Sequence, residues 1–178
     1  MNRIKVNVLR HPEDADWARC LRLGRMTAGN GDLPEKVPMI SWKRKMLEAR
    51  HSPIRTLMFT IEVKGIPYYS AMHFVRHHEG VQWYVKSQRS DTERAFRNQG
   101  EAVDFIMDVN ADGLFNIAAK RLCGKADPVT RGVMLQIKFA VETANPEFQG
   151  LLLPSCGNDP SRCREFSPCT PPIPRSRR

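Results

Sequence analysis

Alternation of apolar and polar positions predicts strands along the chain. In residues 3–9 the side chains of Ile4, Val6 and Val8 alternate with polar ones, the period of a strand with one buried face. The same alternation, and then one compact apolar run, predict further strands. They are expected at residues 54–63, 81–85 and 103–109.

Apolar residues at helical spacing predict the remaining elements. Helices are expected at residues 13–25, 40–50, 67–78, 112–123 and 128–144. One side of the first helix is expected to carry Trp17, Cys20, Leu21 and Met26. We expect Ser41 to cap the second helix and Pro53 to end it. Gly65 and Pro67 are expected to turn the chain after the second strand.

The length of the chain, 178 residues, suits one domain with a tail. We expect the domain at residues 1–153 and an irregular tail at 154–178, which is rich in Pro, Cys and Arg. The sequence has no apolar run of membrane-spanning length and no signal-type N-terminus, so we expect a soluble cytoplasmic protein without a membrane partner.

The net charge of +9 changes the picture by pointing to anionic ligands. The last 18 residues carry five Arg and one Glu, which leaves +5 for the rest of the chain. Two interpretations stay open from charge alone. The tail could bind nucleic acid, or the body could hold a basic pocket for a nucleotide phosphate.

Motifs of most common enzyme classes are absent from the sequence, including phosphate-binding glycine loops, HExxH and G-x-S-x-G. Three other segments carry candidate chemistry. They are HSPIRTLMFTIEVKGIPYYSAMHFVRHH at 51–78, SQR at 87–89 and NADGLFNIAAKR at 110–121. In their combination and order they resemble the flavin-dependent thymidylate synthases (thymidylate synthase complementing proteins), over roughly residues 40–145.

This resemblance is to a compact, divergent member, of the kind that phages encode. The second Arg of the family's Arg-His-Arg signature is His78, the Ser and Asn-Glu of the pattern are replaced within EGVQWYV, and one extra residue precedes Ser87. The segment between the signature and the last helices is shortened to about 91–108. The resemblance implies an α/β (α+β) fold with a mixed or antiparallel sheet flanked by helices.

The resemblance also implies an activity. Family members form homotetramers that methylate deoxyuridine monophosphate to thymidine monophosphate, with FAD as cofactor and with NADPH and methylenetetrahydrofolate as co-substrates. Flavin-dependent hydroxymethylation of the same nucleotide is one alternative. The other is a catalytically silent nucleic-acid-binding protein that uses the Arg-rich tail, with Trp83 or Tyr84 as stacking groups. The resemblance makes nucleic acid the less favoured class of partner.

Site residues are carried over from the family by their matching positions. Those implied for FAD are Ser52, Arg76, His77, His78, Asn110 and Asn116. Those implied for the nucleotide are His73, Ser87, Gln88, Arg89 and Arg121. Arg121 is also implied as the catalytic residue, because its fixed positive charge would favour the electron-rich pyrimidine.

The residues themselves leave simpler alternatives open. Arg76, His77 and His78 could form an exposed, solvated turn, and Asn110 could be a helix N-cap. Ser52 precedes a proline and could belong to an ordinary helix stop.

The cysteines require a separate account. Their odd number argues against a disulfide framework and for a reducing compartment. Four thiols, at Cys123, Cys156, Cys163 and Cys169, are the ligand type for tetrahedral zinc. Because their spacing is looser than usual zinc pairs, surface or packed thiols are the alternative.

Overall fold

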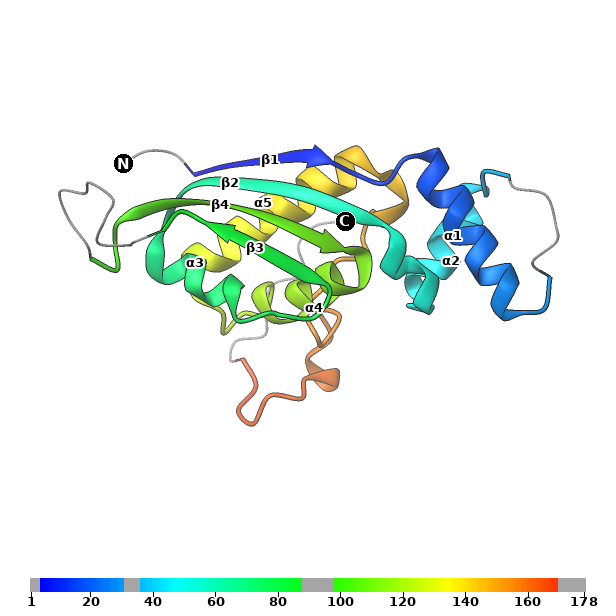
Figure 1. Cartoon of the computed structure of the whole chain (residues 1–178). Helices are drawn as coiled ribbons and strands as arrows, with labels where there is room; N and C mark the ends of the chain where they lie inside the picture. The colour runs from blue at the N-terminus through cyan, green and yellow to red at the C-terminus, as the bar shows by residue number, and fades with distance from the viewer. Residues whose placement is uncertain (1–3, 31–35, 88–97, 170–178) are drawn as a thin grey trace.

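The computed structural model describes residues 4–30, 36–87 and 98–169, and these form one sheet with helices on one face and at one end (Figure 1). The strands are β1 (Lys5–Arg10), β2 (Met58–Pro67), β3 (Val81–Val85) and β4 (Ala102–Asn110). The α-helices are α1 (Asp14–Thr27), α2 (Ile40–Glu48), α3 (Tyr68–Val75), α4 (Ala111–Arg121) and α5 (Pro128–Ala144). Short 3-10 helices are η1 (Ser52–Thr56), η2 (Pro146–Phe148) and η3 (Pro160–Arg162).

The sheet has the strand order β1-β2-β4-β3, and each neighbouring pair is antiparallel. Met107 on the central strand β4 is paired with Ile61 on one side and with Trp83 on the other. The predicted α/β (α+β) class with an antiparallel sheet and flanking helices is therefore confirmed.

The core lies between the sheet and the helices that cover one of its faces. Alternate residues of β2, including Phe59, Ile61 and Val63, are fully buried, as are Phe105 and Met107 of β4. They belong to the same hydrophobic core as Met134 and Ile137 of α5, the helix that covers one face of the sheet in Figure 1. Burying a large apolar side chain contributes about 1.5–3 kcal/mol, so the period of two fixes the register of both strands.

Helices α1 and α2 pack together beyond one end of the sheet (Figure 1). The side chain of Glu13 accepts from the third residue of α1, and Asp16 accepts from the Glu13 amide at 3.0 Å, which together form a capping box. Trp17 and Cys20 are fully buried, as expected. Met26 was expected on the same side but is 59% exposed, because it lies in the last turn, beyond the packed part of the helix.

Other local predictions were wrong at element ends. Helix α2 begins at Ile40 with Met39 as N-cap, so Ser41 is not the cap. Ile54 belongs to η1, and the second strand begins at Met58. Gly65 does not turn the chain: it sits within β2 at a φ of 73°, where the register with β4 shifts, and the strand continues to Pro67.

Residues 154–169 lie beside the C-terminal half of α4 and project below it in Figure 1. The amide and the hydroxyl of Ser155 both donate to the carbonyl of Ala119, at 3.0 and 2.9 Å. The boundary between domain and tail at residue 153 stays a prediction. Within the described ranges, no helix has the length and apolar character needed to cross a bilayer.

Candidate functional site

The turn that follows α3 meets the C-terminal end of α4 at His77. The Nε of Arg121 donates a hydrogen bond to Nε2 of His77 at 3.1 Å. The backbone of His77 is held as well, since its carbonyl accepts from Nε1 of Trp83 at 2.7 Å and its amide donates to Phe74 at 3.0 Å. Two segments that lie 44 residues apart in sequence are thus joined at one histidine.

This contact defines the charge state of His77. Because Nε2 accepts the hydrogen bond, the proton of the neutral ring lies on Nδ1. Burial, then the charges of Arg121, His78 and Lys120, lower the pKa of His77 to about 4. Near neutral pH His77 is therefore an uncharged donor in a positively charged surrounding.

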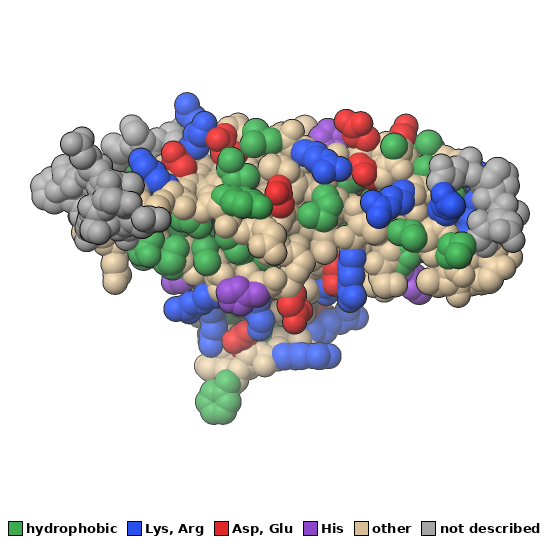
Figure 2. Space-filling view, viewed as in Figure 1, with side chains coloured by type: hydrophobic (Ala, Val, Ile, Leu, Met, Phe, Trp, Pro, Cys, Tyr) green, Lys and Arg blue, Asp and Glu red, His purple; other side chains and the backbone are tan. Residues whose placement is uncertain are grey.

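Arginine side chains gather around His77 without acidic partners. Burial and the charge of Arg76 lower the pKa of Arg121. Among the described residues, no carboxylate forms an ion pair with Arg76, Lys120 or Arg121. Figure 2 shows Lys, Arg and His side chains gathered on the underside of the molecule, where residues 154–169 project. Arg76 and Lys120 are exposed, and Arg121 is partly buried. Unpaired cations gathered at one place favour an anionic ligand.

The same turn also packs against the N-terminal end of α4. Gly80 has a φ of 71°, and its carbonyl accepts from the amide of Asn110 at 2.9 Å. A Cβ on Gly113 would lie only 2.8 Å from that carbonyl, so the close approach requires glycine at this position. The turn from His77 to Gly80 therefore runs along α4, with a contact at each end.

Asn110 and Asn116 already have hydrogen-bond partners within the chain. The Oδ1 of Asn110 accepts from the amide of Gly113 at 2.8 Å, so the N-cap alternative is confirmed. The Oδ1 of Asn116 accepts from Nη2 of Arg50 at 2.6 Å. At 100° per residue, Asn116 lies well around the helix from Arg121, so these two side chains do not converge.

Arg50 contacts a predicted site residue, Asn116, and sequence reasoning missed it. Its guanidinium contacts Asp112 at 2.5 Å as well as Asn116, and lies 5.5 Å from the ring of Phe115. Its backbone has a φ of 50°, an uncommon conformation for a residue other than glycine. Nothing in the sequence marks a left-handed arginine after a helix, so no local signal was available.

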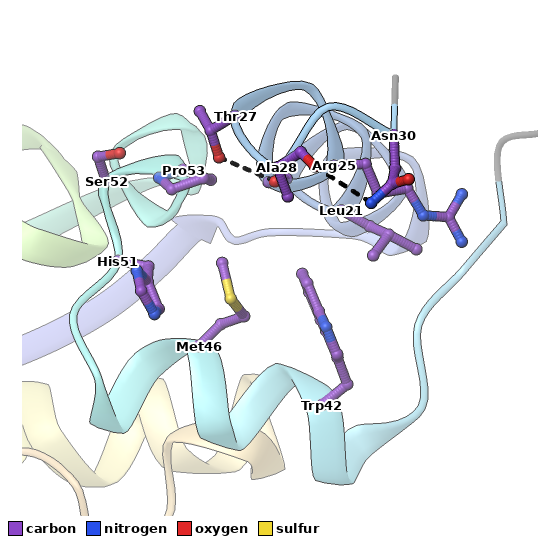
Figure 3. Close-up of a pocket in the computed structure, with 11 residues that line it drawn as sticks. Leu21, Arg25, Thr27, Ala28, Asn30, Trp42, Met46, His51, Ser52 and Pro53 are labelled. Carbon is purple, nitrogen blue, oxygen red and sulfur yellow. Dashed lines mark hydrogen bonds between the residues drawn. The ribbon is translucent and has the colours of Figure 1, made fainter. Parts of the chain in front are cut away.

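Two hollows lie on the η1 side of this arrangement. Ser52 and His51 line a cavity of about 400 Å³ between α1, α2 and η1, with largely apolar walls. Figure 3 shows Trp42 and Met46 rising from α2 toward Leu21 of α1. The second hollow, of about 340 Å³, is lined by Arg55, Glu79, Gly80, Asn110, Asp112 and Gly113, and so joins η1 to the turn and the start of α4.

Comparison with known proteins bears on this geometry. No protein-family model matches the chain, and no curated protein matches it significantly. Solved structures do match. Thymidylate synthase X (ThyX) from Helicobacter pylori, crystallised with FAD and dUMP, has a TM-score of 0.64 and 13% identity, over 84% of this chain and 97% of that one. The chain has the ThyX fold.

A second solved structure has the same likeness. The UMP/dUMP methylase PolB from Streptomyces cacaoi, bound with 5-Br dUMP, has a TM-score of 0.61 and 13% identity, over 82% of this chain and 92% of that one. The resemblance predicted from the sequence is thus confirmed for the fold, since ThyX and this methylase are both structural neighbours. Identity this low shows the fold alone.

Within the ThyX fold, the predicted nucleotide-binding residues are dispersed. Nδ1 of His73 lies 3.0 Å from the hydroxyl of Thr130 at the start of α5, and the hydroxyl of Ser70 lies 2.8 Å from the same atom. Ser87 is exposed just after β3. Gln88 and Arg89 lie outside the described residues. Of the described ones, Arg121 alone contacts the turn after α3, and all five assignments stay predictions.

The predicted zinc ligands find no support. Among the described residues, no group of three or more His, Cys, Asp or Glu side chains could hold a metal ion. Cys123, Cys156 and Cys163 line one cavity, but their thiols do not form a tetrahedral set. Cys20 is fully buried in the core.

Proposed function

We propose that the chain is an FAD-dependent enzyme that methylates deoxyuridine monophosphate. The observation that carries the proposal is the contact between Arg121 and His77, because it joins two motifs that the sequence predicts to share one site. The ThyX fold supports it, since one neighbour was crystallised with FAD and dUMP and the other with a brominated dUMP.

The described residues fit the phosphorylated ligands. Arg76, Lys120 and Arg121 supply positive charge that no described carboxylate neutralises. Arginine can bind a phosphate with two parallel hydrogen bonds, and such charge-assisted bonds are about twice as strong as neutral ones. The cluster therefore suits the diphosphate of FAD or the monophosphate of the nucleotide.

Arg121 and His77 would have different tasks. Arg121 stays charged, so it would attract electron density that builds up on the pyrimidine ring during reaction. His77 is neutral near pH 7, because its pKa is about 4, and its Nδ1 would donate a hydrogen bond without adding charge. Orientation of His77 depends on Arg121 and Trp83 together.

Flavin, when bound, supplies the hydride chemistry that no protein side chain can perform. NADPH would reduce it, and methylenetetrahydrofolate would donate the carbon. We further propose that the chain assembles as a homotetramer. The alternative product is a hydroxymethyl nucleotide. The chain departs from the family pattern at EGVQWYV, where Gly80 packs directly against α4.

Absorbance titration tests the proposal first. Purified protein is mixed with FAD, with and without deoxyuridine monophosphate, and the flavin spectrum is followed. We expect a shifted spectrum that changes again with nucleotide. Arg121→Gln should lose this response, whereas Arg19→Gln, at an exposed position of α1, should keep it. If the wild-type protein binds neither ligand, the proposal is wrong.

Product mass then separates the two reactions. In a single turnover with NADPH and methylenetetrahydrofolate, a methyl product and a hydroxymethyl product differ by one oxygen atom. A protein that binds both ligands but forms neither product would be catalytically silent.

A further inference from the structure

Four of the five cysteines gather where residues 154–169 pack against the end of α4. Cys123, Cys156 and Cys163 line one cavity of about 510 Å³. The thiol of Cys169 forms a hydrogen bond with the thiol of Cys123. This arrangement shares Lys120 with the cations around His77 but includes neither His77 nor Arg121. It is not a metal site, since the described residues hold no metal-binding group.

The segment that carries these thiols is held against α4 by hydrogen bonds. Ser155 donates two hydrogen bonds to the carbonyl of Ala119, at 3.0 and 2.9 Å. This carbonyl belongs to the last turn of α4, and Cys123 follows two residues after that helix ends. Arg162 also forms an ion pair with Asp159 at 3.6 Å, within the same segment.

The cavity that the thiols line is positively charged. Its lining includes Lys120, Arg162 and Arg164, and Glu165 is the one carboxylate among its lining residues. Arginines and lysines around a concave surface raise the local concentration of anions. A small anion that carries a reactive sulfur would therefore be attracted to Cys123.

We propose that Cys123 and Cys169 are a redox-active thiol pair, which an anionic low-molecular-weight disulfide such as oxidised glutathione converts to a disulfide in this cavity. The inference is independent of the proposed nucleotide chemistry. It explains the crowding of cysteines in the sequence without a metal ion.

The reaction is two thiol–disulfide exchanges. The Cys123 sulfur, as thiolate, attacks one sulfur of the small disulfide, which breaks its S–S bond and releases one small thiolate. The Cys169 sulfur then attacks the Cys123 sulfur, forming the protein disulfide and releasing the second small thiolate. The two protein protons end on the two released thiols. The protein pair is oxidised and the small disulfide is reduced.

The order of the two thiols follows from their places. Cys123 lines the cavity and so meets the incoming disulfide, whereas Cys169 touches Cys123. Burial and the neighbouring thiols Cys123 and Cys163 raise the pKa of Cys169, which keeps it protonated until the second step. Oxidation would fix residues 154–169 covalently beside Arg121.

Peptide mapping tests the pairing. Full-length protein is incubated with oxidised glutathione, free thiols are blocked with N-ethylmaleimide, and tryptic digests are analysed by mass spectrometry without reduction. We expect peptide 122–125 linked to peptide 165–175, with a mass lower by two hydrogens than the sum of the two. Reduction should separate them. Cys20 should stay unblocked in the folded protein, because burial raises its pKa to about 12.

Matched serine variants identify the partners. Cys163→Ser should keep the link, whereas Cys123→Ser and Cys169→Ser should both lose it, and Cys169→Ser should accumulate a glutathione adduct on Cys123. A wild-type protein that shows only adducts, or a link through Cys156 or Cys163, would overturn the proposal.

A second arm tests the charge of the cavity. Oxidised glutathione is anionic and cystamine is cationic, so we expect the wild-type protein to form the link several-fold faster with glutathione. Replacing Arg162 and Arg164 together by Gln should remove that preference and leave the rate with cystamine no slower. Equal rates with the two reagents in the wild-type protein would rule out binding of an anionic oxidant in this cavity.

Discussion

The Nε of Arg121 lies 3.1 Å from Nε2 of His77, so the last residue of α4 holds the ring that follows α3. Each side chain changes the other's chemistry. Burial keeps the imidazole neutral, and the charge of the arginine lowers its pKa further. The imidazole occupies one donor of the arginine and leaves its other donors available for a ligand.

His77 should titrate far below an ordinary histidine. Its pKa of about 4 lies below the ordinary histidine value of 6.5, so the unfolded chain takes up a proton at higher pH than the folded protein. This contribution to stability is complete above about pH 6.5 and is lost as pH falls toward 4. Two-dimensional NMR of the imidazole should show the low midpoint. A midpoint near 6.5 would contradict the described geometry.

Arg121→Gln should raise the pKa of His77, because one of the charges that lowers it is removed, while burial still holds it below 6.5. The same variant should weaken nucleotide binding by roughly tenfold to a hundredfold, as a charge-assisted hydrogen bond contributes about 1.5–3 kcal/mol. Calorimetric titration measures the affinity, and Arg19→Gln is the control. Unchanged nucleotide affinity together with a raised His77 pKa would show that Arg121 holds His77 but does not bind the nucleotide.

Gly113→Ala should destabilise the fold and disturb the turn after α3. The added Cβ would lie 2.8 Å from the carbonyl of Gly80, where backbone must move, at a cost of about 1–3 kcal/mol. Gly132→Ala is the matched control, since nothing lies within 4 Å of its Cβ position on α5. There alanine should stabilise by up to about 1 kcal/mol. Urea unfolding measures both, and equal effects would refute the close approach.

Arg50 can be tested by two substitutions that separate contacts from backbone strain. Arg50→Ala loses the bonds to Asp112 and Asn116 and keeps a residue with a Cβ at a φ of 50°. Arg50→Gly loses the same bonds and relieves the strain. We expect the glycine variant to be more stable by about 1 kcal/mol, measured by urea unfolding. The reverse order would show that Arg50 is not left-handed.

Substitutions of Asn110 can separate its role as a helix N-cap from a role in binding flavin. Asp also caps helices well, so Asn110→Asp should keep the free energy of unfolding, whereas Asn110→Ala should lose about 1 kcal/mol. If Asn110 also binds FAD through its amide nitrogen, Asn110→Asp should keep the stability of the wild type but bind flavin more weakly. Equal flavin affinity in the wild type and the Asp variant would leave Asn110 as a cap only.

Much of the fold could be predicted because it depends on local pattern. The period of two in β2, the compact apolar run of β4 and the helical spacing of α5 are properties of neighbouring residues, and the structure has these elements as expected. Element ends were less predictable. Ile54 was expected to begin a strand but lies in η1, because Pro53 starts a 3-10 turn there.

The site was predictable only as separate motifs. The likeness to flavin-dependent enzymes placed Arg76, His77 and Arg121 among the candidates, and the structure joins two of them. It could not show that His73 would contact Thr130, nor that Arg50 would reach Asn116. Such contacts depend on how helices pack across the molecule, and no local pattern encodes that.

The turn after α3 contacts α4 at both ends of that helix. The cluster of Arg76, Lys120 and Arg121 therefore forms only if α4 has the right length. Arg121, which holds His77, lies eleven positions after Asn110, which holds Gly80. One inserted residue would turn Arg121 by about 100° and move it about 1.5 Å, while leaving the N-cap intact. Chains that share this arrangement should therefore have the same number of residues in α4, or a number that differs by nearly whole helical turns.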